Sequence, residues 1–393
     1  QPSIQSSLHF VPPIRHIVYE CLPGAYAGGV QKMVFELAGA QRRLGADVEI
    51  WTPDAVRAGS TEIHDGLPIR YFYPDPLFGL ARSYRLRREI DTLPKEAILH
   101  AHNTFNPLNV QVAEAAAARG LKVFFNPHGA LDPALFSGWD FKSVKKRLYI
   151  RFFTRPKLNR ATGVFALTSL EQTQLISLGI TSPIHVLPNG IRAVAVSSRE
   201  AGLALRARHG LGPDDRVALF VGRITAKKRL EDIIRAIAEQ DAHLFIAGNP
   251  DAEHGYAAML RAVAAGAGCA ARVHWLGFLD EAAKAAAYVA ADCFVHASES
   301  EGMALAILEA MSAGLPVIAT QGCYMAEAAR AGALVECASG PAALTAALRP
   351  LLADLDLARE QGRKGQAYVA RAHDWANLAR RSLQIYAGEG AQA

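Results

Sequence analysis

The amino-acid sequence predicts an α/β protein with two Rossmann-like domains that face a central cleft. The chain has 393 residues, which is more than a single hydrophobic core usually holds. Short apolar runs alternate with amphipathic helical patterns throughout, an order typical of buried parallel sheets covered by helices. This alternation lapses in a polar stretch at about 192–214 and then restarts, so two series of strands are expected.

The first series supplies the sheet of the first domain. Its opening strand precedes a helical pattern over 28–45, which Gly45 ends. The apolar runs that we expect to form its strands lie at 16–22, 47–53, 69–74, 97–103, 122–129, 163–169 and 184–190. Because these runs are continuously apolar rather than alternating, the sheet should be parallel and buried on both faces.

The second series supplies a second sheet. Helical patterns over 229–240 and 281–292 lie between its strands, and apolar residues at helical spacing follow the last strand. The expected strands lie at 216–224, 243–250, 272–279, 293–298, 315–320 and 332–336. We therefore place the first domain at 1–193, the second at 194–370, and a final helix at 371–393 that returns to the first domain.

Composition excludes several classes of protein. With 51% hydrophobic and 20% charged residues, the chain is globular rather than disordered. No window approaches 18 uninterrupted apolar residues, so no membrane-spanning helix is expected, and no signal peptide is recognisable at the start. Five scattered cysteines without a CxxC pair favour a reducing cytoplasm. No GxGxxG follows an expected strand, which argues against a dinucleotide-dependent dehydrogenase.

Positive charge is concentrated in the first half of the chain. Residues 1–193 hold 22 Lys and Arg against 15 Asp and Glu, whereas the remainder holds 20 against 22. Eight of the basic residues, and no acidic one, fall within 141–160, with aromatic and aliphatic residues between them. A basic amphipathic segment favours an anionic membrane surface as a partner. The aromatic residues would also suit nucleic acid, and the simplest alternative is a solvated helix face.

Two carboxylates stand eight positions apart in the stretch HASESEGMALAILEAM. Glu301 precedes a turn of small residues and Glu309 lies in the helical pattern that follows. A helix N-terminus beside such a turn is a ready anion site, for phosphate above all. Two carboxylates this far apart would not share a proton, but each could accept hydrogen bonds from hydroxyls of one elongated, phosphate-containing ligand such as a nucleotide sugar. The alternative is an exposed acidic loop and a solvated helix residue.

Cations follow the first strand of the second series. Arg223 and Lys228 lie between that strand and a helix, at the expected carboxyl edge of the sheet, where open α/β sheets bind ligands. An Arg offers a planar fork for phosphate oxygens and a Lys offers a point charge. The alternative is a solvated basic turn.

The first domain contributes glycines and a histidine. Gly28 and Gly29 lie between the first strand and its helix, where they would permit close approach of a ligand or simply form a tight turn. His128 ends a strand and could donate to a sugar oxygen, although His100 and His102 also lie at the end of a strand. The histidines have no partners at metal-ligand spacing, so we expect no metal site.

Together these stretches resemble the GT-B glycosyltransferases of family 4, the retaining group called group 1. The resemblance spans nearly the whole chain. Its motifs are Gly28-Gly29, His128-Gly129, LPNGI at 187–191, VGRITAKK at 221–228, the Glu-x7-Glu pair within 299–320, and the tail formed by Asp374, Trp375 and Tyr386. NPHGALDP at 126–133 and CYMAEAA at 323–329 look most like transferases of bacterial exopolysaccharide or O-antigen.

The resemblance implies a role for each matched position. Arg223 and Lys228 would hold the donor diphosphate, Glu309 the ribose hydroxyls, and Glu301 a hydroxyl of the transferred sugar. The implied catalytic residues are His128, Arg223, Lys228 and Glu301. The implied donor-binding residues are Gly29, Arg223, Lys228, Phe278, Glu301, Gly302, Met303, Ala304, Leu305 and Glu309. No metal and no cofactor are implied, and the front-face displacement proposed for such enzymes uses no protein nucleophile.

The chain departs from the family's pattern at four positions. Met303 and Ala304 stand where Phe and Gly are usual, Arg229 replaces a Gly, and Ala326 replaces a Pro. These changes bear on the identity of the donor sugar more than on the class of reaction.

We therefore expect a retaining hexosyltransferase that uses a UDP- or GDP-linked donor and a lipid-linked or polysaccharide acceptor in exopolysaccharide, O-antigen or related glycan synthesis. It would act in the cytoplasm or on the inner face of the cell membrane, bound there through 141–160, with no nucleic-acid partner. The alternatives are a GT-B sugar-nucleotide epimerase, which would need carboxylates poised for proton abstraction or hydrolysis, and a non-catalytic GT-B subunit that only binds nucleotide sugar.

Overall fold

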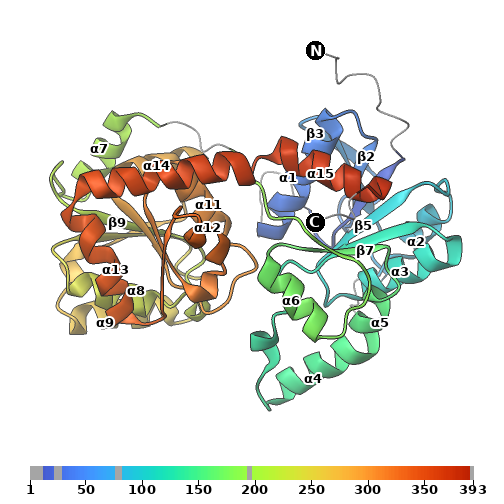
Figure 1. Cartoon of the computed structure of the whole chain (residues 1–393), viewed down its shortest axis with the longest axis horizontal. Coiled ribbons are helices and arrows are strands. Elements are labelled where there is room, and N and C mark those ends of the chain that lie inside the picture. The colour runs from blue at the N-terminus through green and yellow to red at the C-terminus, as the bar shows by residue number, and fades with distance from the viewer. Residues whose placement is uncertain (1–11, 22–28, 76–81, 193–196, 390–393) are drawn as a thin grey trace. The chain divides into compact units, whose positions relative to one another are not determined.

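The computed structural model describes residues 12–21, 29–75, 82–192 and 197–389. They form two compact α/β units (Figure 1). The first unit holds the described residues up to Gly190 and those from Trp375 onward, and the second runs from Ile191 to Asp374. The boundaries thus fall after residues 190 and 374, where the sequence had suggested 193 and 370.

The first unit contains an eight-stranded sheet of order β3-β4-β2-β1-β5-β6-β7-β8. Its strands are β1 (Ile14–Ile17), β2 (Val48–Pro53), β3 (Thr61–His64), β4 (Leu67–Phe72), β5 (Ile98–His102), β6 (Lys122–Asn126), β7 (Gly163–Ala166) and β8 (Ile184–Val186). At the centre of the sheet β1 pairs with β2 and with β5, so that Ile14 lies opposite Val48 on one side and Ile98 on the other. All pairs are parallel except β3 with β4.

Strand β3 is the element of this sheet that the sequence reading missed. It has four residues, and its side chains alternate between exposed and half-buried, so it carries no continuous apolar run. Asp65 and Gly66 join it to β4 with φ values of 49° and 77°, which is the Asp-Gly hairpin turn. The expectation of a purely parallel sheet was therefore wrong at this edge.

Helices cover both faces of the first sheet. One core cluster joins α1 and α15 to one face, and a second cluster joins α2, α3, α5 and α6 to the other. The helices are α1 (Gly29–Arg43), α2 (Tyr84–Ile90), α3 (Pro107–Arg119), η2 (Pro133–Phe136), α4 (Phe141–Tyr149), the π-helix η3 (Ile150–Thr154), α5 (Arg155–Leu158), α6 (Ser169–Ser177) and α15 (Trp375–Ala387). Local sequence sets their ends: the Asn106 side chain caps α3, and Gly120 at φ 65° terminates it.

The second unit contains a six-stranded, wholly parallel sheet of order β11-β10-β9-β12-β13-β14. Its strands are β9 (Val217–Val221), β10 (His243–Ala247), β11 (Val273–Gly277), β12 (Cys293–His296), β13 (Val317–Thr320) and β14 (Val335–Cys337). The order turns back between β9 and its neighbour β12. Ligands of open parallel sheets bind at such a switch point, outside the carboxyl ends of the strands.

The second sheet is also covered on both faces. Residues of α8, α9 and α13 belong to one core cluster, and residues of α10, α11 and α12 belong to another. The helices are α7 (Arg199–Arg208), η4 (Ala226–Lys228), α8 (Leu230–Ala238), α9 (Tyr256–Gly266), η5 (Ala270–Arg272), α10 (Glu281–Ala290), α11 (Leu305–Ser312), η6 (Gln321–Cys323), α12 (Ala326–Arg330), α13 (Pro341–Ala353) and α14 (Leu355–Ala372). None of the described helices is both long enough and apolar enough to cross a bilayer.

The last helix, α15, returns to the first unit and lies beside α1 (Figure 1). Trp375, Leu378 and Tyr386 are buried in the core cluster that contains Phe124. The fit at Trp375 is close, because a Cβ atom on Gly190 would come within 2.4 Å of the indole ring. Replacing Gly190 would therefore push the ring out of its place.

Candidate active site

One group of candidate residues lies in the second unit, at the carboxyl ends of β9 and β12. Two glycines bring the loops after neighbouring strands into close contact. A Cβ atom on Gly248 would lie 2.0 Å from the carbonyl oxygen of Gly222, and one on Gly322 would lie 2.2 Å from that of Ser298. No side chain fits at these distances. The glycines therefore allow the loop after β10 to lie against the loop after β9, and the loop after β13 to lie against the loop after β12.

Lys228 and Glu301 meet at this edge of the sheet. The ammonium group of Lys228 donates to Oε1 of Glu301, and both side chains are largely buried. The Ser298 hydroxyl donates to the same oxygen over 2.5 Å. Nε2 of His296, the last residue of β12, lies 3.4 Å from Nζ of Lys228 and 3.7 Å from Oε1 of Glu301. The fold thus brings together two residues that the sequence predicted for the site.

The charges in this cluster follow from its partners. Burial alone would raise the pKa of Glu301, but the neighbouring His296 ring and the charge of Lys228 outweigh it and hold that pKa well below its usual value. Burial, assisted by Lys228, lowers the pKa of His296. At neutral pH the Glu301 carboxylate therefore lies beside a neutral imidazole of His296.

Arg223 lies at the same edge of the sheet, two residues after β9. Its side chain is exposed, and within the described ranges it has no ion pair or hydrogen bond. Arg223 is thus a solvated cation available to an anionic ligand, whereas Lys228 already has a carboxylate partner.

Arg229 occupies a backbone conformation that usually requires glycine. Its φ is 49° and its ψ is 40°, in the left-handed region, between η4 and α8. Its guanidinium lies 3.0 Å from Asp232 and 3.6 Å from Glu231. The geometry explains why a glycine is usual here in the family that the sequence resembles, and the two carboxylates help to hold the Arg.

Glu309 lies in the first turns of α11 with its side chain buried. The Tyr288 hydroxyl and the Lys284 ammonium, both on α10, lie 3.0 Å from its Oε2. A buried carboxylate needs such partners, and the Lys284 cation and the Tyr288 hydroxyl supply them. The sequence reading anticipated the carboxylate but not its two partners, because they come from another helix.

The remaining donor-binding candidates of the second unit lie at the start of α11 and after β11. Gly302, Met303 and Leu305 are half-buried, and Ala304 is buried and stands at the N-cap. The N-cap residue, an alanine, has no polar side chain with which to cap the first N–H groups. Phe278 directly follows β11, and its side chain is 83% exposed. The structure does not bring it into contact with Glu301 or Lys228.

A separate group of candidate residues lies in the first unit, after β6. His128 has φ 55°, which is uncommon for a residue with a bulky side chain and typical of functional sites. Its backbone N–H donates to the Asn126 side chain over 3.1 Å. The buried carboxylate of Glu171 accepts the N–H groups of Gly129 and Leu167 at 2.7 and 2.6 Å. The turn is therefore fixed by polar groups that sequence reasoning did not identify.

The glycines before α1 can be placed only in part. Gly29 is the first residue of α1 and is exposed. Gly28 lies outside the described residues.

Buried histidines connect His128 to the interior of the first unit. Nε2 of His128 lies 3.0 Å from Nδ1 of His102, and Nε2 of His102 lies 2.9 Å from Nδ1 of His16. Nε2 of His16 in turn lies 2.7 Å from Oε1 of Gln41. His100, also buried, lies 2.6 Å from the Tyr386 hydroxyl through its Nδ1. Three buried histidines thus form one group with His128, which is half-buried.

This group corrects the expectation that the histidines have no clustered partners. Ring nitrogens of His16, His100 and His102 lie within 4.8 Å of one another, close enough to share an ion. The residues come from two neighbouring strands, so their spacing in sequence gave no sign of it. Two of these nitrogens, on His16 and His102, already face each other at hydrogen-bond distance.

The basic segment 141–160 folds as α4, η3 and α5. It exposes large apolar side chains beside its cations: Phe141 is 84% exposed and Phe152 is 61% exposed. Trp139, just before it, is 90% exposed, and the guanidinium of Arg147 lies 5.1 Å from the centre of its indole ring. The segment is therefore not an ordinary solvated polar face, because aromatic rings as well as charges face the water.

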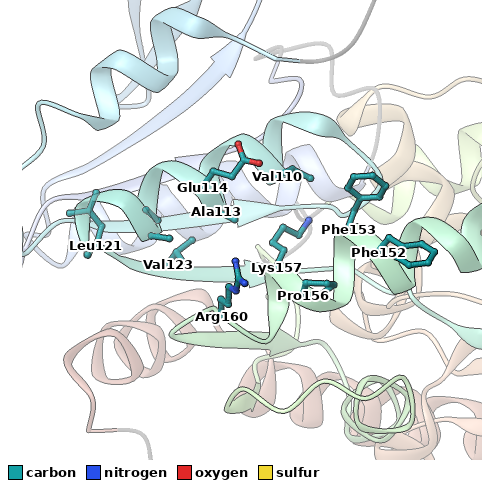
Figure 2. Close-up of a pocket in the computed structure, with 13 residues that line it drawn as sticks. Val110, Ala113, Glu114, Leu121, Val123, Phe152, Phe153, Pro156, Lys157 and Arg160 are labelled. Carbon is teal, nitrogen blue, oxygen red and sulfur yellow. The ribbon is translucent and has the colours of Figure 1, made fainter.

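A pocket of about 450 Å³ lies between α3 and the η3–α5 segment (Figure 2). Val110, Phe152 and Phe153 supply apolar surface to it, and Lys157 and Arg160 supply charge. Lys157 is buried, and its Nζ has no hydrogen-bond partner among the described residues, although it lies 5.1 Å from the centre of the Phe125 ring. Burial lowers the pKa of this lysine to about 8.

Solved structures of low sequence identity share the fold. Sucrose-phosphate synthase from Thermosynechococcus elongatus superimposes with a TM-score of 0.78 and 20% identity over 96% of this chain and 98% of that one. HepE of Anabaena, solved with UDP and glucose, gives 0.76 and 19% over 96% of this chain and the whole of the other. Two α/β units, one with a mostly parallel sheet and the other with a wholly parallel sheet, together with these superpositions identify the GT-B fold.

Sequence families identify the class more closely. Residues 203–368 match the glycosyl transferases group 1, and residues 28–190 match the glycosyl transferase 4-like domain. The phosphatidyl-myo-inositol mannosyltransferase of Mycobacterium leprae is 26% identical to the chain over 383 residues, which cover 91% of this chain and 92% of that protein. The protein is a glycosyltransferase built from a glycosyl transferase 4-like domain and a glycosyl transferases group 1 domain.

Proposed function

We propose that the protein is a retaining, metal-independent hexosyltransferase that moves a sugar from a UDP- or GDP-linked donor to a lipid-linked or glycan acceptor in surface-polysaccharide synthesis. The observation that supports it most is the Lys228–Glu301 pair at the switch point of the second sheet, with Arg223 solvated on the same edge. Cations at this place suit a diphosphate, and a carboxylate suits sugar hydroxyls.

In the proposed mechanism, Lys228 changes partner when the donor binds. The diphosphate would take hydrogen bonds from Lys228 and Arg223, and Glu301 would then be released to accept a hydroxyl of the sugar. Breakage of the bond between anomeric carbon and phosphate builds negative charge on the leaving group, which these fixed cations would stabilise. Glu309, held between Tyr288 and Lys284, would accept the ribose hydroxyls.

The pKa of Glu301 bears on its role. A general acid or base works best with a pKa near the working pH, whereas the neighbouring His296 ring and the charge of Lys228 hold the pKa of Glu301 far below it. We therefore assign Glu301 to binding rather than to proton transfer. This agrees with a front-face displacement that uses no protein nucleophile, and it disfavours the alternative of an epimerase with carboxylates poised for proton abstraction.

A panel of nucleotides and nucleotide sugars tests the proposal. UDP and GDP should be compared in a thermal-shift assay, because a ligand at a hundredfold excess over its dissociation constant adds about 2.7 kcal/mol of stability. Slow hydrolysis of one UDP- or GDP-linked sugar, with the anomeric configuration followed by NMR, should then show retention. Inversion would refute the retaining mechanism. Binding without hydrolysis or transfer would favour the non-catalytic alternative.

We also propose that 141–160 binds an anionic membrane surface on the cytoplasmic side, where a lipid-linked acceptor would be reached. Basic and aromatic side chains are exposed together on this segment, and the pocket beside it has apolar and cationic lining, as a lipid requires. Each Lys or Arg near such a surface contributes about 1 kcal/mol, with a range of roughly 8–10 Å in physiological salt.

Co-sedimentation with vesicles tests this proposal. Lys142, Lys145 and Arg151 are exposed, so replacing all three with Ser should release the protein from anionic vesicles and leave donor hydrolysis intact. Arg147 should be kept, because it donates to the backbone carbonyls of Phe136 and Gly138. The matched control replaces Lys364 on α14 with Ser. Equal pelleting on neutral and anionic vesicles would rule out electrostatic docking.

A further inference from the structure

A continuous path of hydrogen bonds leads from helix α15 to His128. It starts at Ser382, whose hydroxyl donates to the carbonyl oxygen of Ala379 over 2.7 Å. The Gln41 side chain follows at 2.8 Å from the Ser382 oxygen, and then His16, His102 and finally His128. Ser382, Gln41, His16 and His102 are all buried, so no water competes for these bonds along the way.

The direction of every bond in this path is fixed by its first member. Ser382 has one hydroxyl hydrogen, and the carbonyl of Ala379 takes it, so the Ser382 oxygen can only accept from Gln41. The amide nitrogen of Gln41 must therefore face Ser382. Tyr386 supports this orientation, because its hydroxyl lies 3.5 Å from the same nitrogen. The Gln41 oxygen then faces His16 as an acceptor.

An acceptor at Gln41 determines the tautomers of the histidines in turn. His16 must donate from Nε2, so its Nδ1 is an unprotonated acceptor for Nε2–H of His102. Nδ1 of His102 is likewise unprotonated and accepts from Nε2–H of His128. This series of hydrogen bonds requires neutral imidazole rings. Burial lowers the pKa of His16 to about 4 and that of His128 to about 3, and it lowers that of His102 well below 6.5.

We infer that this path makes His102 a positioning residue that holds His128 as its Nε2–H tautomer, with an unprotonated Nδ1 that accepts a hydrogen bond from a hydroxyl of the transferred sugar. The inference rests on the proposed function for the presence of the sugar. Nδ1 has no hydrogen-bond partner among the described residues and is not sealed from solvent, so it is open to a ligand. The expectation that His128 donates to a sugar oxygen is thereby reversed.

The reversal has a consequence for specificity. An unprotonated ring nitrogen attracts a hydroxyl, which can donate, and repels a carboxylate or phosphate oxygen, which cannot. A site that binds a substrate hydroxyl rejects analogues that lack the donor, because its buried acceptor is then left unpaired. The sugar group that contacts His128 should therefore be a neutral hydroxyl rather than an acid.

NMR of the unliganded full-length protein with ¹⁵N-labelled histidine tests the tautomer without any donor. His128→Asn assigns the signals by their loss. We expect Nε2 protonated and Nδ1 unprotonated in His128 between pH 8 and 5.5. Because an isolated imidazole can also adopt this tautomer, the decisive signal is a ¹⁵N–¹⁵N coupling across the hydrogen bond from Nε2–H of His128 to Nδ1 of His102. The opposite tautomer, an imidazolium in this range, or no coupling overturns the inference.

A metal ion at the cluster is the rival explanation of the same residues, and metal analysis of the purified protein decides it. An ion held by His16, His100 and His102 would require an unprotonated Nε2 on His102, whose Nδ1–H would then donate to His128 and impose the opposite tautomer on it. One equivalent of zinc, absent from a His100→Phe variant, would therefore overturn the inference. No bound metal together with the expected coupling supports it.

Activity provides the last test. Asn places an oxygen where Nδ1 of a histidine lies, so His102→Asn keeps an acceptor for His128, whereas His102→Phe removes it. We expect turnover to fall about three- to tenfold in His102→Phe, the effect of one hydrogen bond, and to recover in His102→Asn. Equal loss in both variants would show a merely structural role. Unchanged turnover in both His102 variants, with the NMR result as expected, would place the sugar away from His128. It would refute the contact between His128 and the sugar but not the tautomer.

Discussion

Acidification should destabilise the first unit through its buried histidines. His16 is completely buried, and burial lowers its pKa from the ordinary 6.5 to about 4. A base whose pKa is lowered by folding binds fewer protons in the folded state than in the unfolded state. The stability that it contributes is therefore fully present above pH 6.5 and is lost as the pH falls from 6.5 towards 4. For His16 alone the loss at pH 5 is about 2 kcal/mol.

Hydrogen exchange measured by mass spectrometry can follow this loss in the first unit alone. Peptides that contain β1 and β5 report local opening, and their free energies at pH 7.5 and 5.0 can be compared after correction for intrinsic exchange rates. His16→Asn removes the titrating ring and keeps a small polar side chain. We expect this variant to be less stable at pH 7.5. On acidification, however, its free energy of opening should fall by about 2 kcal/mol less than that of the parent.

The second unit provides the internal control. Peptides of β9 should respond to pH equally in both proteins, because His16 belongs to the core of the other unit. An identical pH response of β1 in the parent and in His16→Asn would refute the reasoning. It would mean either that His16 is charged in the folded protein or that the buried network admits water.

Three further results are expected. Glu309→Ala should weaken nucleoside diphosphate binding about tenfold or more in calorimetry, since a charge-assisted hydrogen bond is worth roughly 1.5–3 kcal/mol, and an unchanged affinity would refute the ribose assignment. Arg223→Ala and Lys228→Ala should each lower turnover by about a hundredfold, and the two losses should not add in the double variant, because both cations act on one charge. Transfer should persist in excess EDTA. Abolition of transfer by EDTA and its rescue by magnesium would show that a metal carries the leaving-group charge. Gly322→Ala should cost about 1–3 kcal/mol in unfolding measurements, because its Cβ would lie 2.2 Å from the Ser298 carbonyl; no measurable loss would mean that the loop is free to move.

The sequence by itself determined the class of fold and most of its elements. Strands buried on both faces are apolar along their whole length, so patterns such as GVFA and VALFV locate β7 and β9 without further information. It also indicated the cations and carboxylates of the candidate site, because open α/β sheets bind ligands at the carboxyl ends of their strands. It missed β3, which is short and half exposed and therefore lacks that pattern.

Tertiary structure alone decided which polar groups meet. Lys228 and Glu301 are 73 positions apart, and Gln41 and Ser382 are 341 apart, so no local pattern could pair them. Parallel strands bring such residues together, since in-register neighbours such as His16 and His100 share one edge of a sheet. The charge of each group then follows from its neighbours. A histidine has the same intrinsic pKa anywhere in the sequence, and only burial and a fixed hydrogen-bond direction determine whether it donates or accepts.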